Sequence, residues 1–117
     1  VLSRLETAAG GRVTWSVVNP ADYEAAGATQ EQAEGLIDLL AQSATADVAI
    51  LFKDLGDVTR ISIRTRDGGV DATKLAGAFG GGGHARAAGA SYEGAFLAAR
   101  DAVLGMTERL LDELPAA

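Results

Sequence analysis

The chain has 117 residues, of which 48% are hydrophobic and 22% charged, as expected for one globular domain with a single core. It contains no cysteine, which excludes disulfides, thiolate metal ligands and thiol catalysis, and no apolar run approaches the roughly 20 residues that a bilayer span needs. Sixteen acidic against ten basic residues give a net charge of −6, a poor overall field for attracting polyanions.

The chain begins at Val1 without an initiator methionine or a signal-peptide core, so we expect it to be part of a longer polypeptide. Residues 1–11 show no periodicity and end in two glycines, which indicates the remnant of an interdomain linker. Residues 12–114 form the predicted domain, and residues 115–117 form a tail. The absence of cysteine agrees with a reducing compartment. We therefore expect a cytoplasmic protein without a membrane partner.

Two strands and two helices are predicted in the first half. Residues 12–18 alternate between two faces, which is typical of a strand. The pair Asn19-Pro20 starts a short helix, and an apolar stripe within residues 29–44 predicts a second one. Residues 47–53 are apolar on both faces, as in an interior strand.

The next strand is predicted at residues 58–66. Because only a short turn around Gly56 separates it from residues 47–53, the two strands are predicted to form an antiparallel hairpin. Ile61 and Ile63 point to one face of this strand. The opposite face carries polar and basic side chains, namely Arg60, Ser62, Arg64 and Arg66.

The remaining elements are a short helix, a glycine run, a strand and a long helix. Asp71 is placed to cap the short helix, which runs into four glycines. A short strand is predicted near residues 90–93, and an amphipathic helix over 94–114, with Phe96, Ala99, Val103, Met106 and Leu110 on one face. The predicted fold class is α/β, a mixed β-sheet with a central antiparallel hairpin, packed against helices in a single domain.

Positive charge is concentrated in one segment. Residues 58–90 hold five basic and two acidic side chains, a local balance of +3, so the remainder carries −9. An acidic body with one basic segment indicates a defined site for an anionic ligand. The alternative is that these arginines are only solvated surface.

The glycine run and its neighbours supply the candidate site. Four glycines let main-chain N–H groups approach a bound phosphate closely, although a flexible linker would have the same composition. His84 follows them directly and can donate to the same phosphate. The strand with Ser62 and Arg64 adds a compact donor and a bidentate cation. Clustered acids and histidines for metal-activated water are missing, so we expect the chain to bind a phosphorylated ligand without cleaving it.

These residues carry a family resemblance. Phe79 to Gly89 read FGGGGHARAAG and closely resemble the F-G-G-G-G-H-x-x-A-A-G signature of the DHH-associated domain, the C-terminal, substrate-binding half of the DHH phosphoesterases. Residues 61–64 resemble the S-x-R strand of the family, and residues 70–76 its V-D-x-x-x-[IL]-A helix start. Thr65 stands where the family usually has a second serine. The similarity covers residues 12–114 and is greatest to the nanoRNase and pAp-phosphatase branch.

The resemblance implies a substrate, a partner domain and a set of site residues. Members of this branch trim short oligoribonucleotides or act on 3′-phosphoadenosine 5′-phosphate (pAp) or on cyclic dinucleotides and their linear products. An N-terminal DHH domain of the same polypeptide would hold two manganese ions. The Asp-His-His motif is absent from this chain, so the chain alone is expected to be inactive, without catalytic residues, metal ligands or a cofactor of its own. Carried over by position, the phosphate-binding residues are Gly81, Gly82, Gly83, His84, Ser62 and Arg64, with Gly80, Arg66 and Arg86 as secondary contacts.

Two alternatives belong to other functional classes. Related glycine-rich domains occur at the C-terminus of alanyl-tRNA synthetases, which favours a non-catalytic RNA-binding module. The net charge and the lack of an aromatic platform beyond Tyr92 speak against stacking of single-stranded RNA as its main mode. A structural role in oligomerisation through the last helix is the weaker alternative, because intrachain packing explains its apolar stripe.

Overall fold

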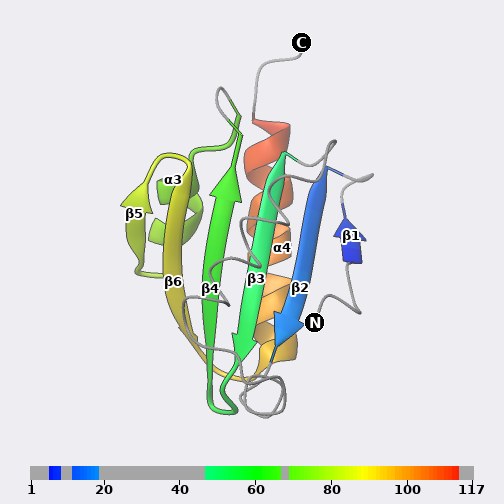
Figure 1. Ribbon diagram of the computed structural model, residues 1–117, viewed down its shortest axis with the longest axis vertical. Helices are drawn as coiled ribbons and strands as arrows, with labels where there is room; N and C mark the ends of the chain where they lie inside the picture. The colour runs from blue at the N-terminus through cyan, green and yellow to red at the C-terminus, as the bar shows by residue number, and fades with distance from the viewer. Residues whose placement is uncertain (1–5, 9–11, 19–46, 67–68, 114–117) are drawn as a thin grey trace.

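The computed structural model describes residues 6–8, 12–18, 47–66 and 69–113 (Figure 1). These residues form a six-stranded sheet in the order β1-β2-β3-β4-β6-β5 and two helices. The elements are β1 (Glu6–Ala8), β2 (Val13–Val18), β3 (Val48–Asp54), β4 (Val58–Thr65), α3 (Ala72–Gly77), β5 (Gly82–His84), β6 (Ala87–Glu93) and α4 (Phe96–Asp112).

The sheet is mixed. Among the described strands, β2 and β3 pair in parallel and the other neighbours pair antiparallel. The predicted central hairpin of β3 and β4 is confirmed, and its turn is closed by the Leu55 amide, which donates to the Val58 carbonyl at 3.0 Å. A parallel pair requires a long crossover. The chain between β2 and β3 is also where the sequence predicts two helices, between Asn19 and Ala44, and these predictions lie outside the described residues.

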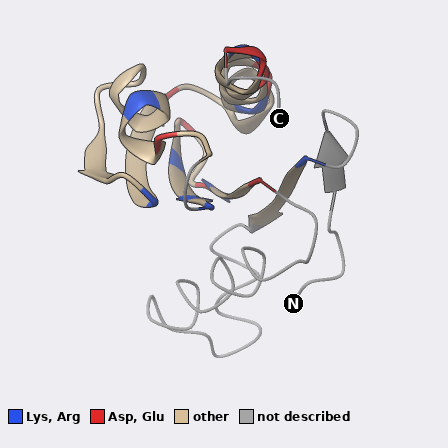
Figure 2. Cartoon of the chain, turned by 90° about the horizontal axis from the view of Figure 1, so that it is seen from above, with Lys and Arg blue, Asp and Glu red and all other residues tan. Residues whose placement is uncertain are grey.

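Both described helices cover the same face of the sheet (Figure 2). The core lies between them and the strands, because the inward side chains of β3 and β4 are almost fully buried. Phe52 and Ile63 are 0% exposed, as are Leu75 of α3 and Val103 of α4. An aromatic cluster closes one part of this core, with the ring of Phe52 5.7 Å from that of Trp15 and 5.5 Å from that of Phe96.

Asp71 caps α3, as predicted. Its carboxylate accepts hydrogen bonds from the backbone N–H of Thr73 at 2.9 Å and from the Thr73 hydroxyl. The hydrogen bond from the Thr73 side chain, together with the one from its amide, lowers the pKa of Asp71. The helix is only six residues long and ends at Gly77. Phe79 therefore lies beyond the helix, where its ring contacts that of Tyr92, with centroids 6.1 Å apart.

The long C-terminal helix is confirmed, with a buried face that differs slightly from the predicted one. Its buried residues follow one another every four positions: Ala99, Val103, Thr107 and Leu111. The predicted Met106 and Leu110 pack only partly buried against the core. Thr107 can occupy the buried stripe because its hydroxyl donates to the Val103 carbonyl at 2.7 Å, which satisfies its polar group.

At the N-terminal edge, Glu6–Ala8 forms β1 and pairs with β2. The assignment of residues 1–11 to a linker remnant did not include this strand. Three residues are too few to show an alternating pattern, so pairing with the neighbouring strand is what defines β1.

Candidate phosphate-binding site

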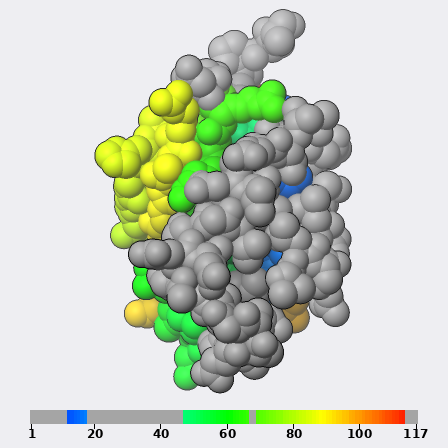
Figure 3. All heavy atoms as spheres, viewed as in Figure 1, coloured from blue at the N-terminus to red at the C-terminus, as the bar shows by residue number. Residues whose placement is uncertain are grey.

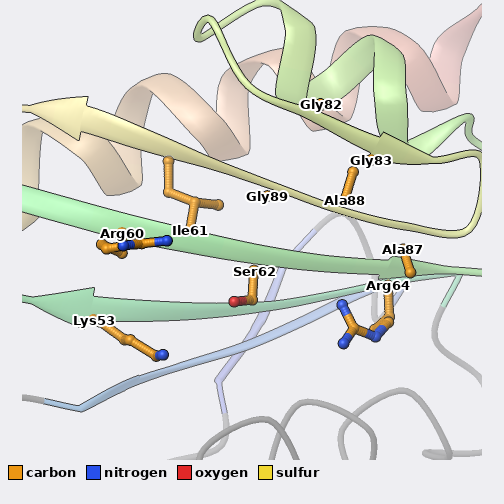
Figure 4. Close-up of a pocket in the computed structure, with 10 residues that line it drawn as sticks. All are labelled: Lys53, Arg60, Ile61, Ser62, Arg64, Gly82, Gly83, Ala87, Ala88 and Gly89. Atoms are coloured by element: carbon orange, nitrogen blue, oxygen red, sulfur yellow. The ribbon is translucent and has the colours of Figure 1, made fainter. Parts of the chain in front are cut away.

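The candidate site lies on the sheet face opposite α3 and α4. Ile61 and Ile63 of β4 are 2% and 0% exposed and face the helices. Because side chains alternate along a strand, Arg60, Ser62 and Arg64 face the other way, as predicted. In Figure 4 the side chains of Ser62 and Arg64 project from β4 to the side opposite Ile61.

The strand register aligns residues of β4, β6 and β5 in two rows on this face. Arg64 is paired with Ala87, and Ala87 is paired with His84. Two residues further along, Ser62 is paired with Gly89, and Gly89 with Gly82. Since directly paired residues share a face, the register brings the predicted Ser62, Arg64, Gly82 and His84 to the same side of the sheet.

A pocket of about 290 Å³ occupies this area (Figure 4). The hairpin of β5 and β6, coloured yellow-green to yellow, lies at the surface on this side of the molecule (Figure 3). Three basic side chains and no carboxylate are among the described residues that line the pocket. These residues are Lys53, Arg60, Ile61, Ser62, Arg64, Gly82, Gly83, Ala87, Ala88 and Gly89.

The second half of the glycine run belongs to a strand and is not a flexible linker. Gly82–His84 forms the edge strand β5. The amides of Gly80 and Gly81 donate to the carbonyls of Gly77 and Ala76 at 3.1 and 2.9 Å. Part of this backbone is therefore used in the turn after α3 and in the pairing with β6, and contact of residues 81–84 with a phosphate stays a prediction.

Two of the glycines are required by the close approach of β6. A Cβ atom on Gly81 would lie 2.1 Å from the carbonyl oxygen of Gly89, and one on Gly83 would lie 2.6 Å from that of Ala87. Gly83 also has a φ of +146°, which L side chains rarely adopt. At these two positions the fold itself explains the glycine.

Gly82 is different. A Cβ atom there would meet nothing within 4 Å, and the residue does not have a left-handed φ. It is exposed and lines the pocket. The described fold therefore does not require glycine at this position, whereas a ligand that approaches the backbone closely would.

The other predicted residues lie outside the pocket lining. His84 is exposed in the row of Arg64, next to the pocket. Arg66 follows β4 and has its Nε 4.0 Å from an Asp47 carboxylate oxygen. Arg86 belongs to the turn between β5 and β6, and Gly80, with a φ of +80°, ends the turn after α3. Arg66 and Arg86 therefore lie at the end of the sheet beyond Arg64.

Two basic residues of the pocket were not predicted from the sequence. Lys53 of β3 and Arg60 of β4 are direct partners in the register and both line the pocket. Like charges directly opposite one another on a sheet repel, so a pocket next to this pair is favourable for an anion. The signal was present in the hairpin prediction, because a short turn fixes which residues are opposite each other.

Thr65 holds the turn that follows His84. Its hydroxyl donates to the carbonyl of Ala85 at 3.1 Å, and its amide donates to the carbonyl of Arg86 at 3.0 Å. The amide of Ala72, at the start of α3, also donates to the Ala85 carbonyl, at 2.7 Å. The turn is therefore tied both to the end of β4 and to α3.

Within the part of the chain that the structure describes, no group of three or more histidine or acidic residues is arranged to hold a metal ion. Over the same residues, no helix is both long and apolar enough to cross a membrane.

The family follows from a comparison with known domains. The profile of the DHHA1 domain matches residues 8–113, nearly the whole chain. The chain belongs to the DHHA1 domain family. The resemblance inferred from the glycine-histidine signature is thereby confirmed at the level of the family. No curated protein matches the chain.

Solved structures show the same fold in different settings. The chain is similar to an exopolyphosphatase-related protein from Bacteroides fragilis, with 19% identity and a TM-score of 0.79, over 97% of this chain and 34% of that one. It is similar to the C-Ala domain of Aquifex aeolicus alanyl-tRNA synthetase, with 20% identity and a TM-score of 0.63, over 92% of this chain and 97% of that one. A pGpG-specific phosphodiesterase from Vibrio cholerae matches with 12% identity and a TM-score of 0.60, over 91% of this chain and 34% of that one.

The share of each neighbour's length that this domain covers differs between them. This DHHA1 domain spans about a third of the length of the exopolyphosphatase-related protein and of the phosphodiesterase, and nearly all of the C-Ala domain. The same fold therefore makes up about a third of two longer chains and nearly the whole of the C-Ala domain.

Proposed function

We propose that this DHHA1 domain binds the phosphate groups of a short oligoribonucleotide or nucleotide phosphate and is the substrate-binding part of a DHH phosphoesterase. The observation that carries the proposal is the pocket in which Ser62 and Arg64 lie beside the backbone of Gly82. A guanidinium can hold two phosphate oxygens at once, and a serine hydroxyl can donate to a third. A glycine backbone lets the phosphate approach without a side chain in the way.

The proposed division of labour assigns hydrolysis to a companion domain. An N-terminal DHH domain with two manganese ions would supply a metal-activated water. The residues of this chain would bind the substrate and orient it. Three cations around the pocket would favour the negative charge of the substrate and its increase during phosphate cleavage. The support for a companion domain is that two of the neighbours are about three times as long as this chain.

Within the family, we favour the branch of oligoribonucleases and pAp phosphatases. The support is the sequence signature between Phe79 and Gly89, together with a pocket whose basic residues extend from Arg64 to Arg60. These residues are four positions apart on one strand, about 13 Å, so that a ligand larger than a single phosphate can contact both.

The second candidate is an RNA-binding module without catalysis. It is favoured by the C-Ala domain, of which this fold covers 97%. A module that follows a long RNA would contact many phosphates, whereas this pocket holds one local group of cations on a chain with a net charge of −6.

Calorimetric titration of the 117-residue chain with pAp and with a long single-stranded RNA, each at several salt concentrations, distinguishes the candidates. We expect pAp to bind with a weak salt dependence, since few phosphates are contacted. Arg64→Gln should weaken pAp binding about tenfold or more. Arg109→Gln removes the same charge from an exposed position of α4. It is the matched control and should leave the pAp affinity unchanged. Tight RNA binding with a steep salt dependence, and no pAp binding, would favour the RNA module.

A further inference from the structure

Two candidate phosphate ligands on different strands, Arg64 and His84, are connected by one side chain. They belong to β4 and β5, which are separated by β6, so that their backbones are about 10 Å apart. Arg64 is followed by Thr65, and His84 is followed by Ala85. The hydrogen bond from the Thr65 hydroxyl to the Ala85 carbonyl, 3.1 Å long, therefore joins the residues next to both ligands.

The three hydrogen bonds to this turn connect it to different parts of the fold. The amide of Ala72 binds the Ala85 carbonyl to α3, on the helix side of the sheet. The amide of Thr65 binds the carbonyl of Arg86, which directly precedes the ladder between β4 and β6. The hydroxyl of Thr65 is the group that links β4 directly to the residue after His84.

We propose that Thr65 is a positioning residue of the phosphate site, whose hydroxyl fixes His84 relative to Arg64 so that both side chains reach the same phosphate. This inference rests on the proposed function of the pocket. Thr65 itself does not line the pocket, and it acts through the turn that it holds. The turn keeps its tie to α3 through Ala72, so removing the hydroxyl should loosen His84 without unfolding the domain.

The proposal also accounts for the departure from the family pattern at this position. The resemblance gives serine where this chain has Thr65, and both residues carry the same hydroxyl on Cβ. Because the contact is made to a backbone carbonyl at the surface, the additional methyl group of threonine does not change the donor. Position 65 should therefore require a hydroxyl and accept either residue.

The test compares Thr65→Val, which keeps the shape of the side chain and loses the donor, with Thr65→Ser, which keeps the donor. Because His84 is the single histidine, the NMR signal of its imidazole Cε1–Hε1 group has no overlap with another histidine and reports directly on its environment. We expect this signal to shift in the unliganded Thr65→Val variant and to match wild type in Thr65→Ser. The affinity for pAp should fall about two- to tenfold in Thr65→Val and return to the wild-type value in Thr65→Ser.

Thr59→Val is the matched control. Thr59 lies on the same strand and donates to the Gly94 carbonyl at 3.2 Å, at the other end of the sheet from His84. It should leave both the His84 signal and the pAp affinity unchanged. An unchanged His84 signal in Thr65→Val, or equal effects of valine and serine, would overturn the proposal. If wild type does not bind pAp, the proposed function fails, while the His84 signal still decides whether Thr65 positions it.

Discussion

Arg64 and His84 are opposite the same residue, Ala87, from the two sides of β6. The row that they form ends at exposed His84 and continues in the other direction to Ala49 of β3, which is buried. The row beside it contains Ser62, Gly89 and Gly82, two of which are glycines without side chains. The row with Arg64 and His84 thus borders a flat one, and under the proposed function a phosphate above the flat row would reach the donors of both.

This arrangement makes Gly82 and Gly83 a matched pair for mutation. Gly82→Ala should leave the free energy of unfolding within about 0.5 kcal/mol of wild type, because the added methyl group meets nothing within 4 Å. It should nevertheless weaken pAp binding, because the methyl group extends into the space where the ligand approaches the backbone. Gly83→Ala should destabilise the domain by about 1–3 kcal/mol, since its Cβ would lie 2.6 Å from the Ala87 carbonyl oxygen.

Thermal or denaturant unfolding and pAp titration of both variants check this prediction. Unfolding at wild-type stability combined with unchanged affinity in Gly82→Ala would show that the ligand does not approach this backbone. Gly105, which is exposed on α4 and also has open space around it, provides a control glycine that should not affect binding.

A second prediction concerns the pair of cations at the other end of the pocket. Arg60→Gln removes the like-charge repulsion with Lys53, so we expect stability to rise by about 0.2–1 kcal/mol. The same change removes a cation from the pocket lining, so pAp affinity should fall about three- to fivefold. Higher stability in denaturant unfolding together with lower pAp affinity in titration would show that the charge of Arg60 serves ligand binding and not folding. Unchanged affinity would assign Arg60 to ordinary solvated surface.

The hairpin and its polar face could be predicted from the sequence because apolar and polar side chains alternate strictly along β4. Ile61 and Ile63 alternate there with polar or basic residues. It did not predict β5, because four consecutive glycines have no side chains from which a period can be read. The pairing with β6 is decided by contacts that form only in three dimensions, such as the close approach of Gly81 to Gly89. For the same reason the composition of the run was also compatible with a flexible linker, whereas Gly82 and Gly83 belong to β5.

The site was predicted in part on similar grounds. Ser62, Arg64, Gly82 and Gly83 line the pocket, and they belong to motifs that are local in the sequence. Lys53 was not among the predicted site residues because it ends an apolar run in the sequence. Its place in the pocket depends on the register with Arg60, which is a property of the hairpin rather than of either segment.

The cap of α3 predicts a specific pH dependence. Hydrogen bonds from Thr73 lower the pKa of Asp71, so the folded state favours the carboxylate form. The stabilisation is fully present above the unfolded pKa of about 3.9 and is lost as the pH falls through the lower folded value. Asp71→Ala should therefore lower the Tm at neutral pH, and its difference from wild type should shrink at pH values below about 3.9.

Asp71→Asn provides the control for that experiment, because asparagine is also a good N-cap but does not titrate. Its Tm should stay near wild type at neutral pH. A difference between wild type and Asp71→Ala that persists unchanged into acid would show that the charge of Asp71 does not contribute to the cap.

The final prediction concerns α4, which supports the sheet from the side opposite the pocket. Gly105 lies in the interior of this 17-residue helix and is exposed, and a methyl group added there would have nothing within 4 Å. Glycine in a helix interior is less favourable than alanine by about 0.8–1.0 kcal/mol, because it loses more backbone freedom on folding. Gly105→Ala should therefore stabilise the domain by about that amount in denaturant unfolding, with pAp affinity unchanged. A destabilised variant would mean that this helix surface is already in contact with other parts of the protein, and reduced affinity would link α4 to the pocket on the far side of the sheet.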